Sequence, residues 1–115
     1  MPTRNHEQDK IALLQGTLDL LILRTLLFGQ EHGQGIARAI QTQSGDELLV
    51  DHGSLYPALQ RLLVKGWVRA QWGTSDNNRR ARYYTLTSSG KKQLGIEAEN
   101  FERMIQAIAR VMQTA

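Results

Sequence analysis

Residues 53–66 read GSLYPALQRLLVKG, the most informative stretch of the sequence. An apolar residue returns every three or four positions, which predicts an amphipathic helix with one inward stripe. The stripe consists of Leu55, Leu59, Leu62 and Leu63. Ser54 suits the N-cap, Pro57 falls in the first turn, and Gly66 ends the helix. The opposite face is polar, basic and aromatic, and it carries Tyr56, Gln60, Arg61 and Lys65.

Two more helices are expected before this one. The first covers about residues 11–28 and is apolar on almost all sides. A single small core cannot bury such a helix completely, so part of it should face a second surface. A turn over residues 30–33 leads into the second helix, at about 34–43, and the apolar run 48–50 predicts a small strand or an extended connection.

The segment after the Leu55 helix alternates between apolar and polar residues and predicts two strands, at about 68–72 and 83–86. Between them, residues 73–81 are rich in glycine, asparagine and aspartate and include arginines, a composition that a turn tolerates and a core does not. We therefore expect a β-hairpin with a basic tip. Both tryptophans, Trp67 and Trp72, are expected to lie in the core.

A long last helix should follow the hairpin, with Thr87 as its cap and its end near Met112. Its apolar residues are separated alternately by four and three positions, the spacing of an a/d seam. They are Leu94, Ala98, Phe101, Ile105, Ile108 and Met112. Such a seam is short for a free-standing coiled coil, so it should pack against another helix of the same chain or of a second copy.

The charges are unevenly placed along the chain. The whole sequence has a net charge of +3, but residues 53–93 carry eight basic side chains against Asp76 alone, a local net charge of +7. The flanking parts, residues 1–52 and 94–115, are slightly acidic. Such a concentrated positive field attracts a polyanion, most simply the phosphates of nucleic acid. A merely solvated basic face is the alternative.

Three helices followed by a two-stranded hairpin with a basic tip is the order of a winged helix-turn-helix, a mainly α fold with a small β-hairpin wing. One helix fits the major groove of B-DNA, which is about 12 Å wide, so the polar face of the third helix is a candidate surface for double-stranded DNA. Its candidate contacts are Tyr56, Gln60, Arg61 and Lys65, and those of the hairpin are Asn77, Asn78, Arg79, Arg80 and Arg82. For the Tyr56 ring, a partly buried place in the core is the alternative.

The composition excludes several other classes of protein. With 115 residues, 41% of them apolar and 22% charged, the chain has room for one globular domain. It has no cysteine, which excludes disulfide scaffolds, zinc ribbons and iron–sulfur clusters. The histidines His6, His32 and His52 lack metal-ligand spacing, so neither a metal nor a cofactor is predicted. Asp51, His52 and Ser54 are too close in sequence to line up as a catalytic triad, and no enzyme is predicted.

No membrane contact is expected either. The most apolar run, residues 18–28, contains Asp19 and Arg24 and is far too short to cross a bilayer of about 30 Å. Residues 1–10 are mostly polar, without an apolar stretch or a cleavage site, so they are expected to form a loose tail and not a signal peptide. A cytoplasmic location is therefore expected.

Several separated motifs, in the same order, closely resemble the PadR-like family of bacterial transcriptional regulators. They are LLQGTLDLLIL at 13–23, His32-Gly33, GSLYPAL at 53–59, Gly66-Trp67, NNRRARYYTLT at 77–87, and Gly90. The resemblance covers about residues 11–95. Members of this family are dimeric winged-helix repressors. The resemblance implies a recognition helix over about 54–65 that includes Ser54 and Pro57 besides Tyr56 and Arg61, and a wing over about 73–82 with the three arginines.

The single helix after the wing is similar to a compact subgroup of the family. In that subgroup the last helix pairs with the first helix of a partner, which implies a homodimer. It also implies three segments: a tail over residues 1–10, a DNA-binding domain over 11–90 and a C-terminal dimerisation helix over 91–115. The implied dimerisation residues are Leu13, Leu14, Leu94, Phe101, Ile105, Ile108 and Met112.

The sequence departs from the family at two points that concern ligands. Many relatives have an aromatic residue after the His-Gly pair, where this chain has Gln34. Some compact relatives hold flat aromatic drugs between tryptophans at the dimer centre, but Phe101 is the sole aromatic residue of the last helix here. The sequence thus predicts a homodimeric, sequence-specific repressor, and leaves a small-molecule effector of unknown identity open. A winged-helix protein-interaction module without specific DNA binding is the alternative.

Overall fold

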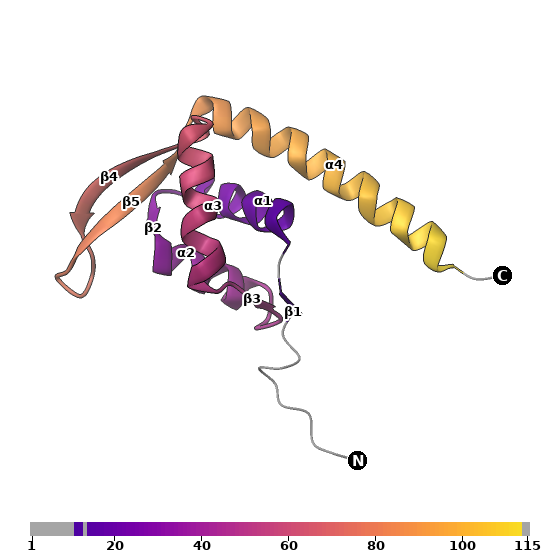
Figure 1. The fold of residues 1–115 in the computed structure, drawn as a ribbon, viewed down its shortest axis with the longest axis horizontal. Helices are drawn as coiled ribbons and strands as arrows, with labels where there is room; N and C mark the ends of the chain where they lie inside the picture. Colours follow the sequence, from indigo (N-terminus) through magenta and orange to yellow (C-terminus); the bar gives the residue numbers. More distant parts are fainter. Residues whose placement is uncertain (1–10, 13, 114–115) are drawn as a thin grey trace, which may run out of the picture.

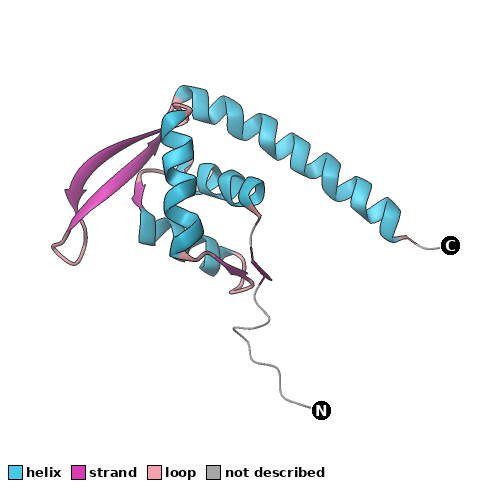
Figure 2. Ribbon diagram, viewed as in Figure 1, coloured by secondary structure: helices cyan, strands magenta, loops and turns pink. Residues whose placement is uncertain are grey.

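Three helices and a small sheet form the body of the protein, and a fourth, much longer helix extends away from it (Figure 1). The computed structural model describes residues 11–12 and 14–113. The expected tail over residues 1–10, and Leu13, lie outside the described residues. The mainly α fold predicted from the sequence is confirmed (Figure 2). Its helices are α1 (Gln15–Leu26), α2 (Gly33–Gln43), α3 (His52–Val64) and α4 (Ser88–Met112).

The first helix begins later than the sequence predicts. Residues Ile11–Ala12 form a short strand, β1, which pairs in parallel with β3 (Leu48–Leu49). The backbone there is extended, and α1 starts only at Gln15. The small strand expected at 48–50 is confirmed, whereas a helix from residue 11 is wrong. The apolar pattern of residues 11–12 did not distinguish the two structures, because a pair of adjacent apolar residues is compatible with a strand as well as with a helix.

Helix α3 has a different first turn from the one expected. Asp51 is its N-cap, because its Oδ1 atom accepts a hydrogen bond from the backbone N–H of Ser54 at 2.8 Å. The N-cap role predicted for Ser54 is therefore wrong: it is the third residue of the helix. Pro57 is the sixth residue, so it lies in the second turn, where the carbonyl of Gly53 loses the hydrogen bond that a backbone N–H would donate.

The hairpin is longer than predicted and is joined by a third strand. β4 (Val68–Thr74) and β5 (Arg80–Leu86) pair antiparallel and leave only residues 75–79 for the turn. β2 (Glu31–His32) pairs with the other edge of β5, so part of the turn predicted over residues 30–33 is a strand. Because α2 follows β2 directly, this pairing fixes the start of α2 beside the hairpin.

The core lies where α1, α2 and α3 meet the base of the sheet. Its most deeply buried side chains are Leu18, Ile22, Leu23, Ile36, Leu55, Leu59, Leu62 and Val68, so the inward stripe of α3 is confirmed. Trp67 packs partly buried against this core. Trp72 is 57% exposed, and the core position predicted for it is wrong. It lies farther along β4 than Val68, where the hairpin has run past the helices (Figure 1).

The start of α4 is fixed at the turn between α3 and β4. The backbone N–H of Thr87 donates to the Trp67 carbonyl at 3.1 Å, and its hydroxyl donates to the Gly66 carbonyl at 2.8 Å. The same hydroxyl accepts from the backbone N–H of Gly90 at 2.9 Å, so the N-cap predicted at Thr87 is confirmed. Gly90 is buried, and a Cβ atom there would overlap the Trp67 carbonyl oxygen. Only glycine allows this approach.

The rest of α4 leaves the body. Leu94 is buried and Phe101 is partly buried against the core, but every residue from 102 to 113 is exposed. The radius of gyration is therefore 16.0 Å, against about 13 Å for a compact domain of 100 residues. The predicted a/d seam is divided: its first part packs within its own chain, and from Ile105 onward it has no cover in the described part of the chain.

Replacing Gly90 by alanine should lower the free energy of unfolding by about 2–3 kcal/mol, because α4 must move off the Trp67 carbonyl. Gly95 is the matched control: it lies on the same helix, is exposed, and would place an added Cβ atom in open space, with no neighbour within 4 Å. Gly95→Ala should raise the free energy of unfolding by about 0.5–1 kcal/mol through helix propensity. Urea titrations at one protein concentration measure both. Equal effects of the two substitutions would contradict the close contact at Gly90.

Candidate nucleic-acid interface

The outer face of α3 presents most of the polar and aromatic side chains that the sequence predicts for it. Ser54, Pro57 and Gln60 are exposed, and Tyr56 is 45% exposed. The Tyr56 ring rests on the start of α2, where a Cβ atom on Gly33 would come within 3.0 Å of it. This close packing holds the ring of Tyr56 at the surface beside the hairpin, so its alternative place in the core is not observed.

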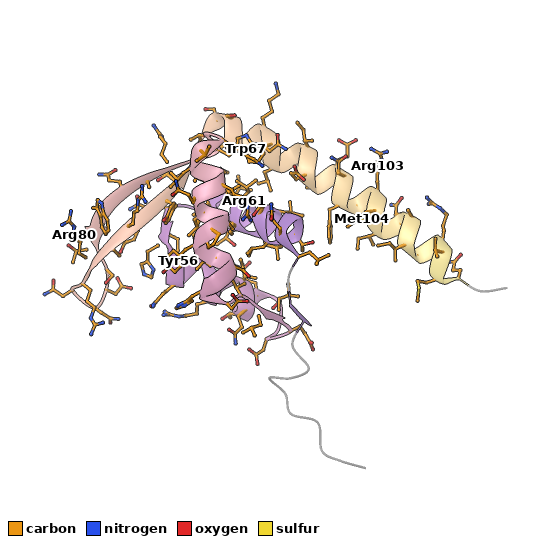
Figure 3. The ribbon with its side chains drawn as sticks, in the orientation of Figure 1. Tyr56, Arg61, Trp67, Arg80, Arg103 and Met104 are labelled. Carbon is orange, nitrogen blue, oxygen red and sulfur yellow. The ribbon has the colours of Figure 1, made fainter. Side chains whose placement is uncertain are left out.

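Arg61 does not point outward as predicted. Its Nη2 atom donates to Oδ1 of Asp19 on α1 at 2.8 Å, and its Nε atom is buried without a hydrogen-bond partner (Figure 3). The two side chains are 29% and 14% exposed. The prediction that Arg61 belongs to the outer face is therefore wrong, because a carboxylate on the neighbouring helix draws the guanidinium inward. The sequence gives no sign of this pair, since its members are 42 residues apart.

Lys65 is exposed but lies far from Tyr56. It is the C-cap of α3, and its ammonium group stands 4.7 Å from the centre of the Trp67 ring. It lies nine positions after Tyr56, an axial distance of about 13.5 Å along the helix. Lys65 therefore belongs to the end of α3 where α4 begins, and the structure does not bring it together with the arginines of the hairpin.

The turn of the hairpin is a tight loop with exposed polar side chains. The backbone N–H of Asn78 donates to the Ser75 carbonyl at 2.9 Å, and that of Ser75 donates to the Arg79 carbonyl at 2.7 Å. Asn78 has φ +58°, a left-handed conformation that asparagine tolerates better than most residues. Asn77, Asn78 and Arg79 are all exposed at the tip, where a nucleic-acid backbone can reach them.

A groove of about 640 Å³ lies between the start of α2, Tyr56 and the hairpin. We call it the cationic groove. Four arginines line it, Arg38, Arg79, Arg80 and Arg82, against one acidic residue, Asp76. Other side chains of the groove include His32, Gln34, Trp72 and Asn77. The sequence missed Arg38 and His32 as members of this site, because only the β2–β5 pairing brings them to the hairpin. It missed Trp72 because the alternation along β4 assigned this ring to the core.

Two of these arginines stand over aromatic rings of the hairpin. The Arg80 guanidinium lies 4.7 Å from the centre of the Trp72 ring, and that of Arg82 lies 5.9 Å from the centre of the Tyr84 ring. Burial raises the pKa of the Tyr84 hydroxyl above its ordinary value of 10.0, although the positive charge of Arg82 acts in the opposite direction. Tyr84 therefore stays neutral near pH 7 and adds no negative charge beside Arg82.

Neither a metal site nor a membrane span is found in the described part of the chain. Its His, Asp and Glu side chains form no group of three or more that is suited to a metal ion. None of its helices combines the length and the apolar character needed to cross a bilayer.

Comparison with known proteins identifies the family of this chain. Residues 22–96 match the sequence profile of the transcriptional regulator PadR-like family. The chain belongs to the PadR-like family of transcriptional regulators. The winged helix that carries the cationic groove is thus the DNA-binding winged helix of a PadR-like protein, and the resemblance seen in the sequence is confirmed.

Individual relatives agree with this membership. A protein from Lysinibacillus sphaericus, named uncharacterized protein X, is 30% identical over 82 residues, or 71% of this chain and 75% of that protein. A transcriptional regulator from Clostridium thermocellum, of known structure, is 25% identical with a TM-score of 0.78, covering 86% of this chain and 96% of that one. A PadR family transcription regulator from Clostridium difficile R20291 is 26% identical with a TM-score of 0.69, covering 84% and 98%.

The dimerisation residues expected of this PadR-like chain fall into two groups. Leu94 is buried in the chain's own core, and Phe101 is partly buried against it. The second group is exposed, with exposed fractions of 80% for Leu14, 44% for Ile105, 49% for Ile108 and 72% for Met112. Leu13 lies outside the described residues. Met104 and Val111 extend the open surface of α4 and were not predicted. Figure 3 shows Met104 on the side of α4 that faces the body, and Arg103 on the opposite side.

Arg61→Ala should lower the free energy of unfolding by about 1–3 kcal/mol, because it leaves the mostly buried Asp19 carboxylate without its partner. Asp19→Ala and the double variant complete a double-mutant cycle, in which the double variant should lose clearly less than the sum of the single losses. Gln60→Ala, an exposed neighbour on α3, is the control and should change stability by less than about 0.5 kcal/mol. Chemical unfolding monitored by circular dichroism measures all four. Additive losses would contradict the ion pair.

Proposed function

We propose that this protein is a homodimeric, sequence-specific DNA-binding repressor of transcription. The observation that carries the proposal is the cationic groove beside the recognition helix. Four arginines and one acidic residue line this groove, and the exposed Tyr56 lies at its side. A groove lined in this way matches a phosphate backbone, and the adjacent helix α3 is narrow enough to enter the major groove of B-DNA. We propose no enzymatic activity for the protein and a cytoplasmic place of action.

In this proposal α3 reads bases and the wing holds the backbone. Tyr56 and Gln60 contact base edges or thymine methyl groups, and Ser54 and Pro57 lie at the approaching end of the helix. The wing contacts phosphates or the neighbouring minor groove through Asn77, Asn78, Arg79, Arg80 and Arg82. Arg38 on α2 contributes a further contact from the cationic groove. Lys65 reaches at most a phosphate at the far end of α3. Arg61 supports the surface from inside, because its charge is already paired with Asp19.

The second half of α4 is proposed to bind a second copy of this chain. Ile105, Ile108 and Met112 lie on one side of the helix, and Met104 and Val111 widen the stripe. Such an apolar stripe on a projecting helix is typical of a homodimer interface. Leu14, at the start of α1, offers an exposed apolar surface for the partner's α4. Residues 11–90 then form the DNA-binding unit and 91–115 the dimerisation arm, although Leu94 and Phe101 belong to the core.

The dimer would present two copies of α3 to successive major grooves. Half-sites on one face of B-DNA are about 34 Å apart, and α4, with 25 residues, is about 37 Å long. A helix of this length can set the distance between two heads. Any effector that shifts this distance must bind the two states of the dimer with different affinity, and its identity is not part of the proposal.

Replacing both Arg79 and Arg80 by alanine should reduce the steepness of log affinity against log salt by about two, because each phosphate contact contributes about 0.9. The duplex is one selected by the protein from a random pool of oligonucleotides. Arg69→Ala with Lys91→Ala removes the same charge from exposed residues outside the groove and should leave the slope almost unchanged. An unchanged slope in the Arg79 and Arg80 variant would favour a protein-interaction module over a DNA-binding wing.

Ile108→Asp should convert the dimer into monomers and weaken binding to a symmetric duplex by more than about tenfold, because linked half-sites gain from their effective concentration. The substitution is at an exposed position of the single chain, so the chain itself should stay folded. Gln106→Asp introduces a similar charge on the other side of α4 and is the control. Sedimentation equilibrium gives the mass. A dimer that survives Ile108→Asp would exclude this stripe as the interface.

A further inference from the structure

Trp72 is an exposed aromatic ring on the inner face of the hairpin. Across the two strands Val68 pairs with Leu86, Ala70 with Tyr84, and Trp72 with Arg82, so all of these side chains share one face. At the base this face is buried in the core, as Val68, Tyr84 and Leu86 show. Farther out the same face lines the cationic groove, and there Trp72 is 57% exposed. The fold does not need this ring for its core.

Arg80 is stacked on this ring. Arg80 pairs with Thr74 and is therefore the diagonal neighbour of Trp72, a position from which a long side chain reaches across. Its guanidinium lies 4.7 Å from the ring centre. The hairpin's second such pair, Arg82 over Tyr84, uses a ring that is only 4% exposed. Of these two pairs, only the Trp72–Arg80 pair offers both an aromatic surface and a cation to an external partner.

We propose that Trp72 is a further DNA-contacting residue and that it positions Arg80. This inference rests on the proposed DNA-binding function. Stacking uses the flat face of the guanidinium and leaves the N–H donors at its rim free for the two oxygens of a phosphate. It also restricts a side chain that would otherwise lose much rotamer freedom on binding. The exposed edge of the indole then packs against the deoxyribose next to that phosphate, where it loses water-exposed apolar surface.

A double-mutant cycle on a duplex selected by the protein tests the pair. Trp72→Ala and Arg80→Ala should each weaken binding about tenfold, and the double variant should weaken it far less than a hundredfold, because either change destroys the same contact. Arg79 supplies the control, since it lies at the tip without a ring partner among the described contacts. Trp72→Ala and Arg79→Ala should multiply their effects. Trp72→Phe keeps a ring face and should restore affinity to within about threefold of the original chain.

A spectroscopic measurement separates contact from a merely structural role. The chain has two tryptophans, so Trp67→Phe leaves Trp72 as the one fluorophore of its kind. Duplex DNA should then reduce the quenching of its fluorescence by acrylamide. The melting temperature of Trp72→Ala should equal that of the original chain within about 2 °C, because the ring is mostly exposed.

The outcomes distinguish this inference from the proposed function. Three results would each overturn the role of Trp72 and leave the DNA-binding function standing. They are an unchanged DNA affinity of Trp72→Ala, effects of Trp72→Ala and Arg80→Ala that multiply, and unchanged acrylamide quenching while fluorescence anisotropy reports DNA binding. Failure of the original chain to bind any duplex would overturn both. A coupled loss with rescue by Trp72→Phe supports the pair.

Discussion

The arrangement of the whole molecule depends on the approach of α4 to the turn after α3. Thr87 binds the carbonyls of Gly66 and Trp67 and at the same time caps α4, and Gly90 lets the helix lie directly on that backbone. The end of α3, the base of the hairpin and the start of α4 therefore meet in one corner. These hydrogen bonds and the close backbone contact hold the first turn of α4 against the body.

The cationic groove is assembled from three parts of the chain. The wing supplies Arg79, Arg80 and Arg82, α2 supplies Arg38, and α3 supplies Tyr56. The β2–β5 pairing holds the first two parts together, and the contact of Tyr56 with Gly33 holds the third. Positive charge is thus concentrated on one concave surface, where mutual repulsion makes a bound polyanion more favourable than it would be for scattered charges.

Arg61 shows that a basic residue of α3 can pair with a neighbouring helix instead of extending into solvent. Its pairing with Asp19 ties α3 to α1, and both groups are partly shielded from water. Because the carboxylate offsets much of the guanidinium charge, the pair serves mainly to hold α3 against α1. The outer face of α3 is left with mainly neutral polar and aromatic side chains, while the wing and α2 supply the charge.

Much of this protein is determined by its sequence alone. Local spacing predicts the order of the elements and their inward faces, through the leucine stripe of α3, the alternation in the hairpin and the cap at Thr87. Local composition, in the +7 charge of residues 53–93, predicts the nature of the partner. Only the tertiary structure decides which side chains meet. Four features follow from how residues far apart in the chain pack together. They are the inward turn of Arg61, the exposure of Trp72, the position of Arg38 in the groove and the division of the α4 seam. Periodicity gives the face on which a side chain lies, but the partner that approaches that face is set by how the elements pack.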